Sequence, residues 1–191
     1  MTASDEIASA EILTTLGKFV TSFSYLLLAL EKSTITLLSP GPVGSIVPET
    51  VIKQRTLLRA ALSDRTASPM VSTFFSVIYE KWKDNLCDGD REILKHLRRE
   101  LDDVIKERNR LMHDAWFWVV KSSNQNDGVL IRERLRANGR GVEIEEQEYS
   151  LERMNDLVEN VRRLAGVVLM MVWDYRSGRN HEICERLNNR R

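Results

Sequence analysis

Apolar residues recur every three or four positions along most of the chain, which is the spacing of one face of an α-helix. The first such pattern runs from about residue 5 to residue 38. A loop rich in proline and glycine follows it, over 39–48. The second pattern opens at Pro48, because proline is tolerated in the first turn of a helix, and ends at about Leu62. The third begins at Ser68-Pro69, with Ser68 as its expected N-terminal cap.

Two longer helices are predicted further along the chain. One begins at Asp88 or Asp90 and ends near Ala115. The other starts from a Ser150 cap and ends near Tyr175. Its apolar residues alternate in threes and fours, as at the seam of a helical bundle. They are Leu151, Met154, Val158, Val161, Ala165, Val168, Val172 and Tyr175.

The hydrophobic period changes between the last two helices. Residues 129–136 and 142–149 alternate as strands do, and Asn138-Gly139 between them is a strong hairpin signal. Residues 117–120 are a candidate third strand. A small β insertion is therefore expected at about 117–149.

The hairpin carries a row of arginines. A two-residue turn at Asn138-Gly139 would place Arg134 opposite Glu143 and Arg132 opposite Glu145. Opposite charges across an antiparallel pair stabilise a sheet. We therefore interpret these arginines as partners within the sheet rather than as contacts to nucleic acid.

These patterns together predict a mainly all-α fold. We expect a single domain over residues 1–191, built as an up-and-down bundle of about five helices with a small β-hairpin insertion between the last two long helices. A basic C-terminal tail occupies about 178–191.

The charge balance excludes one class of nucleic-acid protein. Lys and Arg number 28, as do Asp and Glu, so the chain has no net charge. A protein that coats nucleic acid through a broad basic surface would be strongly basic, although a local basic pocket is compatible with neutrality. The two cysteines, Cys87 and Cys184, lie far apart and form no disulfide or zinc pattern. We therefore expect no metal and no cofactor.

The chain shows no targeting or membrane pattern at this stage. Its N-terminus is acidic and lacks the basic region of a signal peptide. The longest nearly apolar run, 164–173, is ten residues, whereas a spanning helix needs roughly 20. A cytoplasmic protein without a membrane partner is expected.

One segment carries residues suited to chemistry. With residues about 100° apart around a helix, Arg108 falls in the middle of the apolar stripe that contains Leu101 and Val104. A charge there must be paired, lie at an interface or face a polar cavity. Asn109 and His113 lie one turn apart on the flank of the stripe. Of these side chains, His113 is the one that can move a proton near neutral pH.

The segment Arg108-Asn109-Arg110-Leu-Met-His113 resembles the signature of the HEPN superfamily (higher eukaryotes and prokaryotes nucleotide-binding). That signature is an arginine, four to six residues and a histidine, commonly with Asn, Asp or His directly after the arginine. Arg91 with His96 and Arg176 with His181 have the same spacing. Neither of those arginines is followed by asparagine or lies within an apolar stripe, so Arg108 and His113 are the preferred pair.

The resemblance implies a metal-independent endoribonuclease, such as a toxin or defence effector. Arg108, Asn109 and His113 would be catalytic, and Arg110 would bind substrate. In such a reaction the 2′-hydroxyl of RNA attacks the adjacent phosphate and leaves a 2′,3′-cyclic phosphate. Histidine can move the protons, and arginine can stabilise the charge on the transition state. The resemblance also implies a homodimer with a composite active site, an RNA substrate, and an antitoxin or regulatory protein as a further partner.

A second function remains open on the residues alone. The chain could be a non-catalytic helical domain that binds a protein or a nucleotide. Arg108 would then pair with a core carboxylate, and His113 would cap the helix C-terminus, where a cationic ring is favoured. The neutral charge favours this alternative, whereas the position of Arg108 within the stripe favours the ribonuclease.

Overall fold

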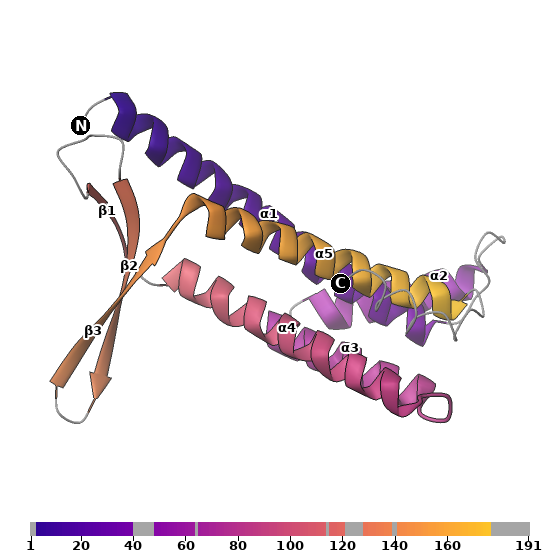
Figure 1. Ribbon diagram of the computed structural model, residues 1–191. Coiled ribbons are helices and arrows are strands. Elements are labelled where there is room, and N and C mark those ends of the chain that lie inside the picture. Colours follow the sequence, from indigo (N-terminus) through magenta and orange to yellow (C-terminus); the bar gives the residue numbers. More distant parts are fainter. Residues whose placement is uncertain are drawn as a thin grey trace. The chain divides into compact units, whose positions relative to one another are not determined.

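The computed structural model describes residues 3–39, 48–63, 65–113, 115–120, 128–138 and 141–176. Residues 40–47 of the loop predicted at 39–48 lie outside these residues, as does the basic tail. The described chain is mainly helical, and the predicted up-and-down helical bundle is confirmed (Figure 1). Its helices are α1 (Ala3–Leu38), α2 (Glu49–Ser63), α3 (Ala67–Trp82), α4 (Asp88–His113) and α5 (Leu151–Arg176), and its strands are β1 (Ala115–Val120), β2 (Gly128–Asn138) and β3 (Gly141–Tyr149).

The chain divides into two compact units. The first comprises Met1–Phe23 and Lys106–Val161, and the second comprises Ser24–Ile105 and Arg162–Arg191. Helices α1, α4 and α5 each contribute residues to both units. The single domain expected from the sequence stays a prediction.

The second unit contains parts of all five helices and a closely packed apolar core. Phe74 and Phe75 of α3 are fully buried there, with their rings edge to face at a centroid distance of 5.4 Å. Such a pair contributes about 0.5–1.5 kcal/mol beyond the burial of its area. Helix α5 runs through both units, and six of the residues predicted at its seam are buried, whereas Leu151 is half-buried and the side chain of Tyr175 lies outside the described part. The six are Met154, Val158, Val161, Ala165, Val168 and Val172.

Replacing Phe74 with alanine is expected to lower the free energy of unfolding by about 3–5 kcal/mol, because it opens a large cavity in a fully buried site. Urea denaturation followed by circular dichroism measures the change. Leu57→Ala is the control, since Leu57 in α2 is 72% exposed, and its cost should stay below about 0.5 kcal/mol. Equal costs for the two variants would contradict the assigned core.

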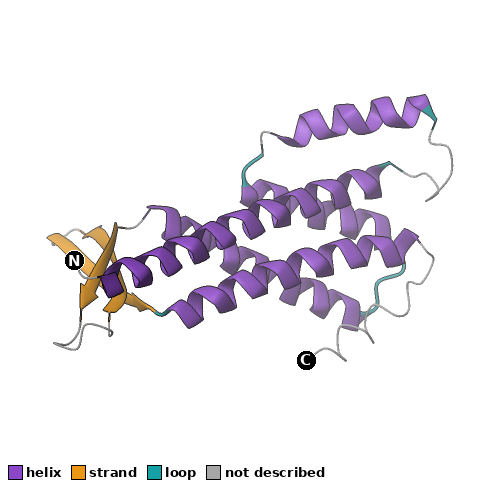
Figure 2. Ribbon diagram, turned by 90° about the horizontal axis from the view of Figure 1, so that it is seen from above, coloured by secondary structure: helices purple, strands orange, loops and turns teal. Residues whose placement is uncertain are grey.

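The β insertion belongs to the first unit and is larger than a hairpin. Its three strands form an antiparallel sheet in the order β1-β2-β3. Figure 2 shows the strands in orange. The sequence predicts its third strand as a candidate at 117–120, and β1 spans Ala115–Val120. Only residue 114 separates α4 from β1, and only Ser150 separates β3 from α5. The insertion therefore joins the ends of two helices that both enter the first unit.

The predicted register of the hairpin is wrong by two residues. Asn138 pairs with Gly141, so the connection consists of residues 139 and 140 rather than Asn138-Gly139. Arg134 therefore pairs with Glu145, and Arg136 with Glu143. A shift of two keeps every side chain on its predicted face of the sheet, since strand side chains alternate with period two. Residues of opposite charge are therefore still paired across the two strands, but the arginine opposite each glutamate is two residues further along β2 than predicted.

The two predicted helix caps have different outcomes. The Ser150 hydroxyl accepts a hydrogen bond from the Arg153 backbone N–H at 3.1 Å, so Ser150 caps α5 as predicted. The prediction for Ser68 is wrong, because α3 begins earlier, with Thr66 at the cap position. Thr66 makes no side-chain capping bond. Proline at position 69 is still accommodated, since the first helical turn has no intrahelical acceptor for its missing N–H.

Helix α1 contains a segment that qualifies by length and composition as a membrane span, Ala10–Leu38, of which 39% is buried inside the structure. The sequence pattern points instead to 164–173 as the longest apolar run, because threonine, serine, glycine and lysine interrupt α1. Core helices of water-soluble proteins and signal sequences have the same length and composition. The expectation of a cytoplasmic protein without a membrane partner stays a prediction.

Candidate functional site

The residues of the predicted motif occupy the last two turns of α4, in the first unit. The buried side chains of Val104, Ile105 and Leu111 define the packed side of the helix at this level. Arg108 lies within that apolar stripe, as the sequence predicts. Its side chain is nevertheless half-buried rather than enclosed. The packed side of α4 is therefore partly open to solvent at Arg108.

Two neighbours hold the Arg108 guanidinium. Its Cζ lies 5.9 Å from the ring centroid of Phe23 in α1, a cation–π contact. Its Nη1 donates a hydrogen bond to Asn109 Oδ1 at 3.1 Å. No carboxylate among the described residues lies within ion-pair distance of it. The side chain is thus oriented by an aromatic ring and an amide. Because both groups are uncharged, no described residue compensates its positive charge.

His113 is placed apart from this pair. It is the last residue of α4, and its side chain is exposed. Five residues along a helix separate two side chains by about 140° around the axis, so Arg108 and His113 lie on different faces of α4. Within one chain, then, Arg108 and Asn109 are in contact, and His113 is not among their contacts.

Glu107 is a residue of this site that the sequence pattern does not select. Only 8% of it is exposed, and its carboxylate lies between two arginines. Arg110 Nη1 donates to Glu107 Oε2 at 3.1 Å, and Arg153 Nη2 of α5 is 3.7 Å from Glu107 Oε1. Arg110, the predicted substrate-binding residue, is thus engaged with Glu107. The spacing of Glu107 and Arg110 is a signal visible in the sequence.

Arg153 is the second residue that sequence reasoning missed. Its guanidinium lies over the ring of Tyr149, 4.4 Å from the centroid. Tyr149 ends β3 and is only 1% exposed, so the ring is a fixed surface. The start of α5 therefore brings a third arginine to the end of α4. Nothing in the pattern of either segment pairs positions 107 and 153.

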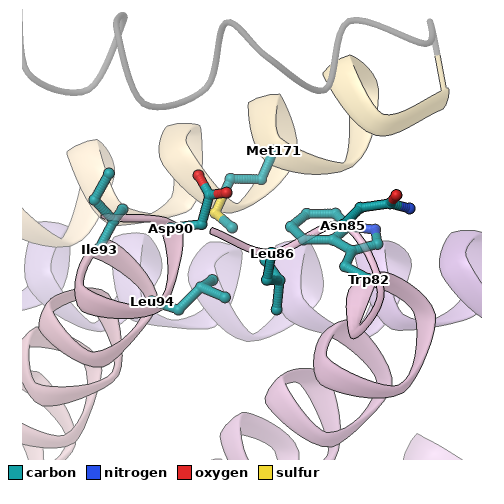
Figure 3. A pocket seen from close by; sticks show the side chains of 7 residues that line it. All are labelled: Trp82, Asn85, Leu86, Asp90, Ile93, Leu94 and Met171. Atoms are coloured by element: carbon teal, nitrogen blue, oxygen red, sulfur yellow. The ribbon is translucent and has the colours of Figure 1, made fainter. Parts of the chain in front are cut away.

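A small pocket lies elsewhere, in the second unit. Its volume is about 40 Å³, which is room for only a few water molecules. Figure 3 shows its lining, which comes from the end of α3, the connection that follows it, the start of α4 and the C-terminal part of α5. It contains none of the predicted site residues; its lining is Trp82, Asn85, Leu86, Asp90, Ile93, Leu94 and Met171.

Comparison with known proteins found no matching family model, no similar curated protein and no similar solved structure. Membership of the HEPN superfamily therefore stays a prediction carried by the motif. Across the described residues, no group of three or more His, Cys, Asp or Glu side chains is arranged to hold a metal ion. The groups available for chemistry at the end of α4 are guanidinium, amide, carboxylate and imidazole.

Proposed function

We propose that the protein is a metal-independent endoribonuclease of the HEPN type that acts as a homodimer. The guanidinium of Arg108 is the observation that carries the proposal. It is half-buried, is oriented by Phe23 and Asn109, and meets no carboxylate in the described part of the chain. A fixed cation of this kind is suited to an anionic ligand, because its charge is not already neutralised.

Arg108 would act on the phosphate. When the 2′-hydroxyl of RNA attacks phosphorus, negative charge accumulates on the non-bridging oxygens. A guanidinium placed in advance stabilises that charge, with two parallel N–H donors where the geometry allows. Asn109 is a positioning residue in this scheme, since its Oδ1 accepts one of the guanidinium N–H groups.

His113 would move the protons. One imidazole accepts the proton of the 2′-hydroxyl as the oxygen–phosphorus bond forms, and a second donates a proton to the 5′-oxygen as its bond to phosphorus breaks. The products are a 2′,3′-cyclic phosphate and a 5′-hydroxyl. No redox step and no further reactant is needed. The exposure of His113 supports this role, because an RNA strand can reach it.

A second copy of the chain would complete the site. Arg108 and His113 lie on different faces of α4, and the two proton transfers call for two histidines. Met112, the neighbour of His113, is 45% exposed, as apolar side chains at a subunit interface are in the isolated chain. A toxin or defence role would add an antitoxin or regulatory protein as partner, and we place the reaction in the cytoplasm.

The test is incubation of the purified protein with total RNA in excess EDTA. We expect cleavage that leaves 2′,3′-cyclic phosphate ends. The double variant Arg108→Ala/His113→Ala, purified in parallel, controls for contaminating nucleases and should leave the RNA intact. Intact RNA with both proteins, or equal cleavage by both, would refute the ribonuclease. If light scattering shows that the protein is a monomer, the homodimer is refuted.

A further inference from the structure

Glu107, Arg110 and Arg153 form a charged group beside the predicted motif, which we call the Glu107 cluster. It joins the end of α4 to the start of α5 within the first unit. The proposed cleavage reaction uses neither Glu107 nor Arg153. The cluster therefore needs a physical explanation of its own.

The charges of the cluster do not balance. A buried carboxylate is costly unless cations compensate it, and one arginine would neutralise Glu107. Two are present, so the cluster has a net charge of +1. Arg108, on the next residue of the same helix, raises the local charge to +2, in a chain whose total charge is zero. Positive charge is thus concentrated at the end of α4.

The contact between Arg153 and Glu107 is incomplete. Its N–O distance of 3.7 Å is too long for a hydrogen bond, and the buried Glu107 Oε1 has no hydrogen-bond partner among the described residues. The Arg153 guanidinium lies over the ring of Tyr149. The N–H groups of a guanidinium point outward in the plane of the group, and the Arg153 side chain is 43% exposed. The guanidinium is therefore held in place by the buried Tyr149 ring, and its donors are accessible to a ligand.

A second arginine–glutamate pair between α4 and α5 makes the direct hydrogen bond that is missing in the Glu107 cluster. In the second unit, Arg163 Nη2 donates a short hydrogen bond to Glu100 Oε1. That pair already makes the bond that Arg153 and Glu107 leave unmade. Glu100 is also more exposed than Glu107, with 26% of its side chain accessible against 10%. The difference sets the Glu107 cluster apart from an ordinary bridge between helices.

We propose that Arg153 and Arg110, spaced by Glu107, bind a backbone phosphate of the RNA strand next to the phosphate that is cleaved. This subsite rests on the proposed ribonuclease function. A phosphodiester oxygen would accept hydrogen bonds from the N–H groups of Arg153 that Glu107 does not engage, and a guanidinium already held over the Tyr149 ring would lose little conformational freedom on binding. Glu107 is a positioning residue, because it holds both arginines at the end of α4.

The experiment measures RNA binding in the His113→Ala background, so that the probe is not cut. A short fluorescein-labelled single-stranded RNA is titrated with protein at several NaCl concentrations, with fluorescence anisotropy as readout. Arg153→Ala should weaken binding about tenfold and lower the slope of log K against log[salt] by about 0.7, the loss of one phosphate contact. Arg163→Ala, which removes the matched arginine of the second unit, should change Kd less than twofold and leave the slope unchanged.

Glu107→Gln separates a phosphate contact from a structural ion pair. It breaks the same pair but keeps Arg153, so the salt slope should stay at the parent value. The subsite is refuted if Arg153→Ala binds RNA like the parent, or if Arg153→Ala and Glu107→Gln lower affinity and slope alike. If wild-type protein still cleaves RNA in either case, the ribonuclease stands without the subsite. If the parent binds no RNA and the wild type cleaves none, both proposals fail.

Discussion

Arg108→Ala is expected to lower the rate of RNA cleavage by about 10³-fold or more, the effect of removing an arginine that stabilises a phosphoryl transition state. The fold should be retained. The side chain is half-buried and makes a cation–π contact worth about 1 kcal/mol. It forms no buried ion pair with any described residue, so its removal leaves no buried charge unpaired there. Single-turnover cleavage of a labelled RNA gives the rate, and thermal denaturation by circular dichroism gives the stability.

Arg98→Ala is the matched control for this variant. Arg98 also lies in α4 and over a phenylalanine ring, with its Cζ 5.7 Å from the centroid of Phe75. Its removal takes away the same kind of contact and the same charge but leaves the motif intact. Cleavage should stay within about twofold of wild type, since surface contacts of this kind contribute little. A cooperative loss of structure in Arg108→Ala alone would assign Arg108 a structural role instead.

His113→Ala is expected to lower the cleavage rate by about 10²–10⁴-fold, the usual contribution of general acid–base catalysis. RNA binding should be nearly unchanged, because the imidazole acts on the reacting oxygens rather than on the strand as a whole. The histidine is exposed at the end of α4, so the substitution removes no core packing. Rates and anisotropy titrations on the same RNA separate the two effects.

His96→Ala controls for the loss of a histidine from α4. His96 is exposed, lies 3.7 Å from Glu100 through Nε2, and follows Arg91 with the spacing of the motif. A spacing match without the asparagine and the stripe position should have no catalytic consequence, so this variant should cleave RNA at the wild-type rate. Equal loss in both histidine variants would show that the motif does not identify the site.

The fold was largely predictable because it depends on local patterns. The seam of α5 could be listed from the three- and four-residue spacing of its apolar residues, and six of those residues are buried. The Ser150 cap and the β insertion also follow from residue types within a few positions of one another. The hairpin register was not predictable in the same way. Moving the turn by one residue, from 138–139 to 139–140, shifts the pairing partners by two residues and keeps the same alternation of faces, so the hydrophobic pattern fits both registers.

The candidate site was also predictable only where it depends on local pattern. The helical period by itself places Arg108 within the apolar stripe of α4, and it places Asn109 and His113 on its flank. The degree of exposure of that stripe at Arg108 depends on Phe23, which comes from another helix. The burial of Glu107 and its pairing with Arg153 likewise depend on α5. Periodicity within one helix carries no information about which residue of a distant segment will face it, because that is decided by how the helices pack. The sequence alone thus determined the helices and strands and the position of Arg108 within α4, while tertiary packing decided that Glu107 is buried between Arg110 and Arg153 and that Arg108 lies against Phe23.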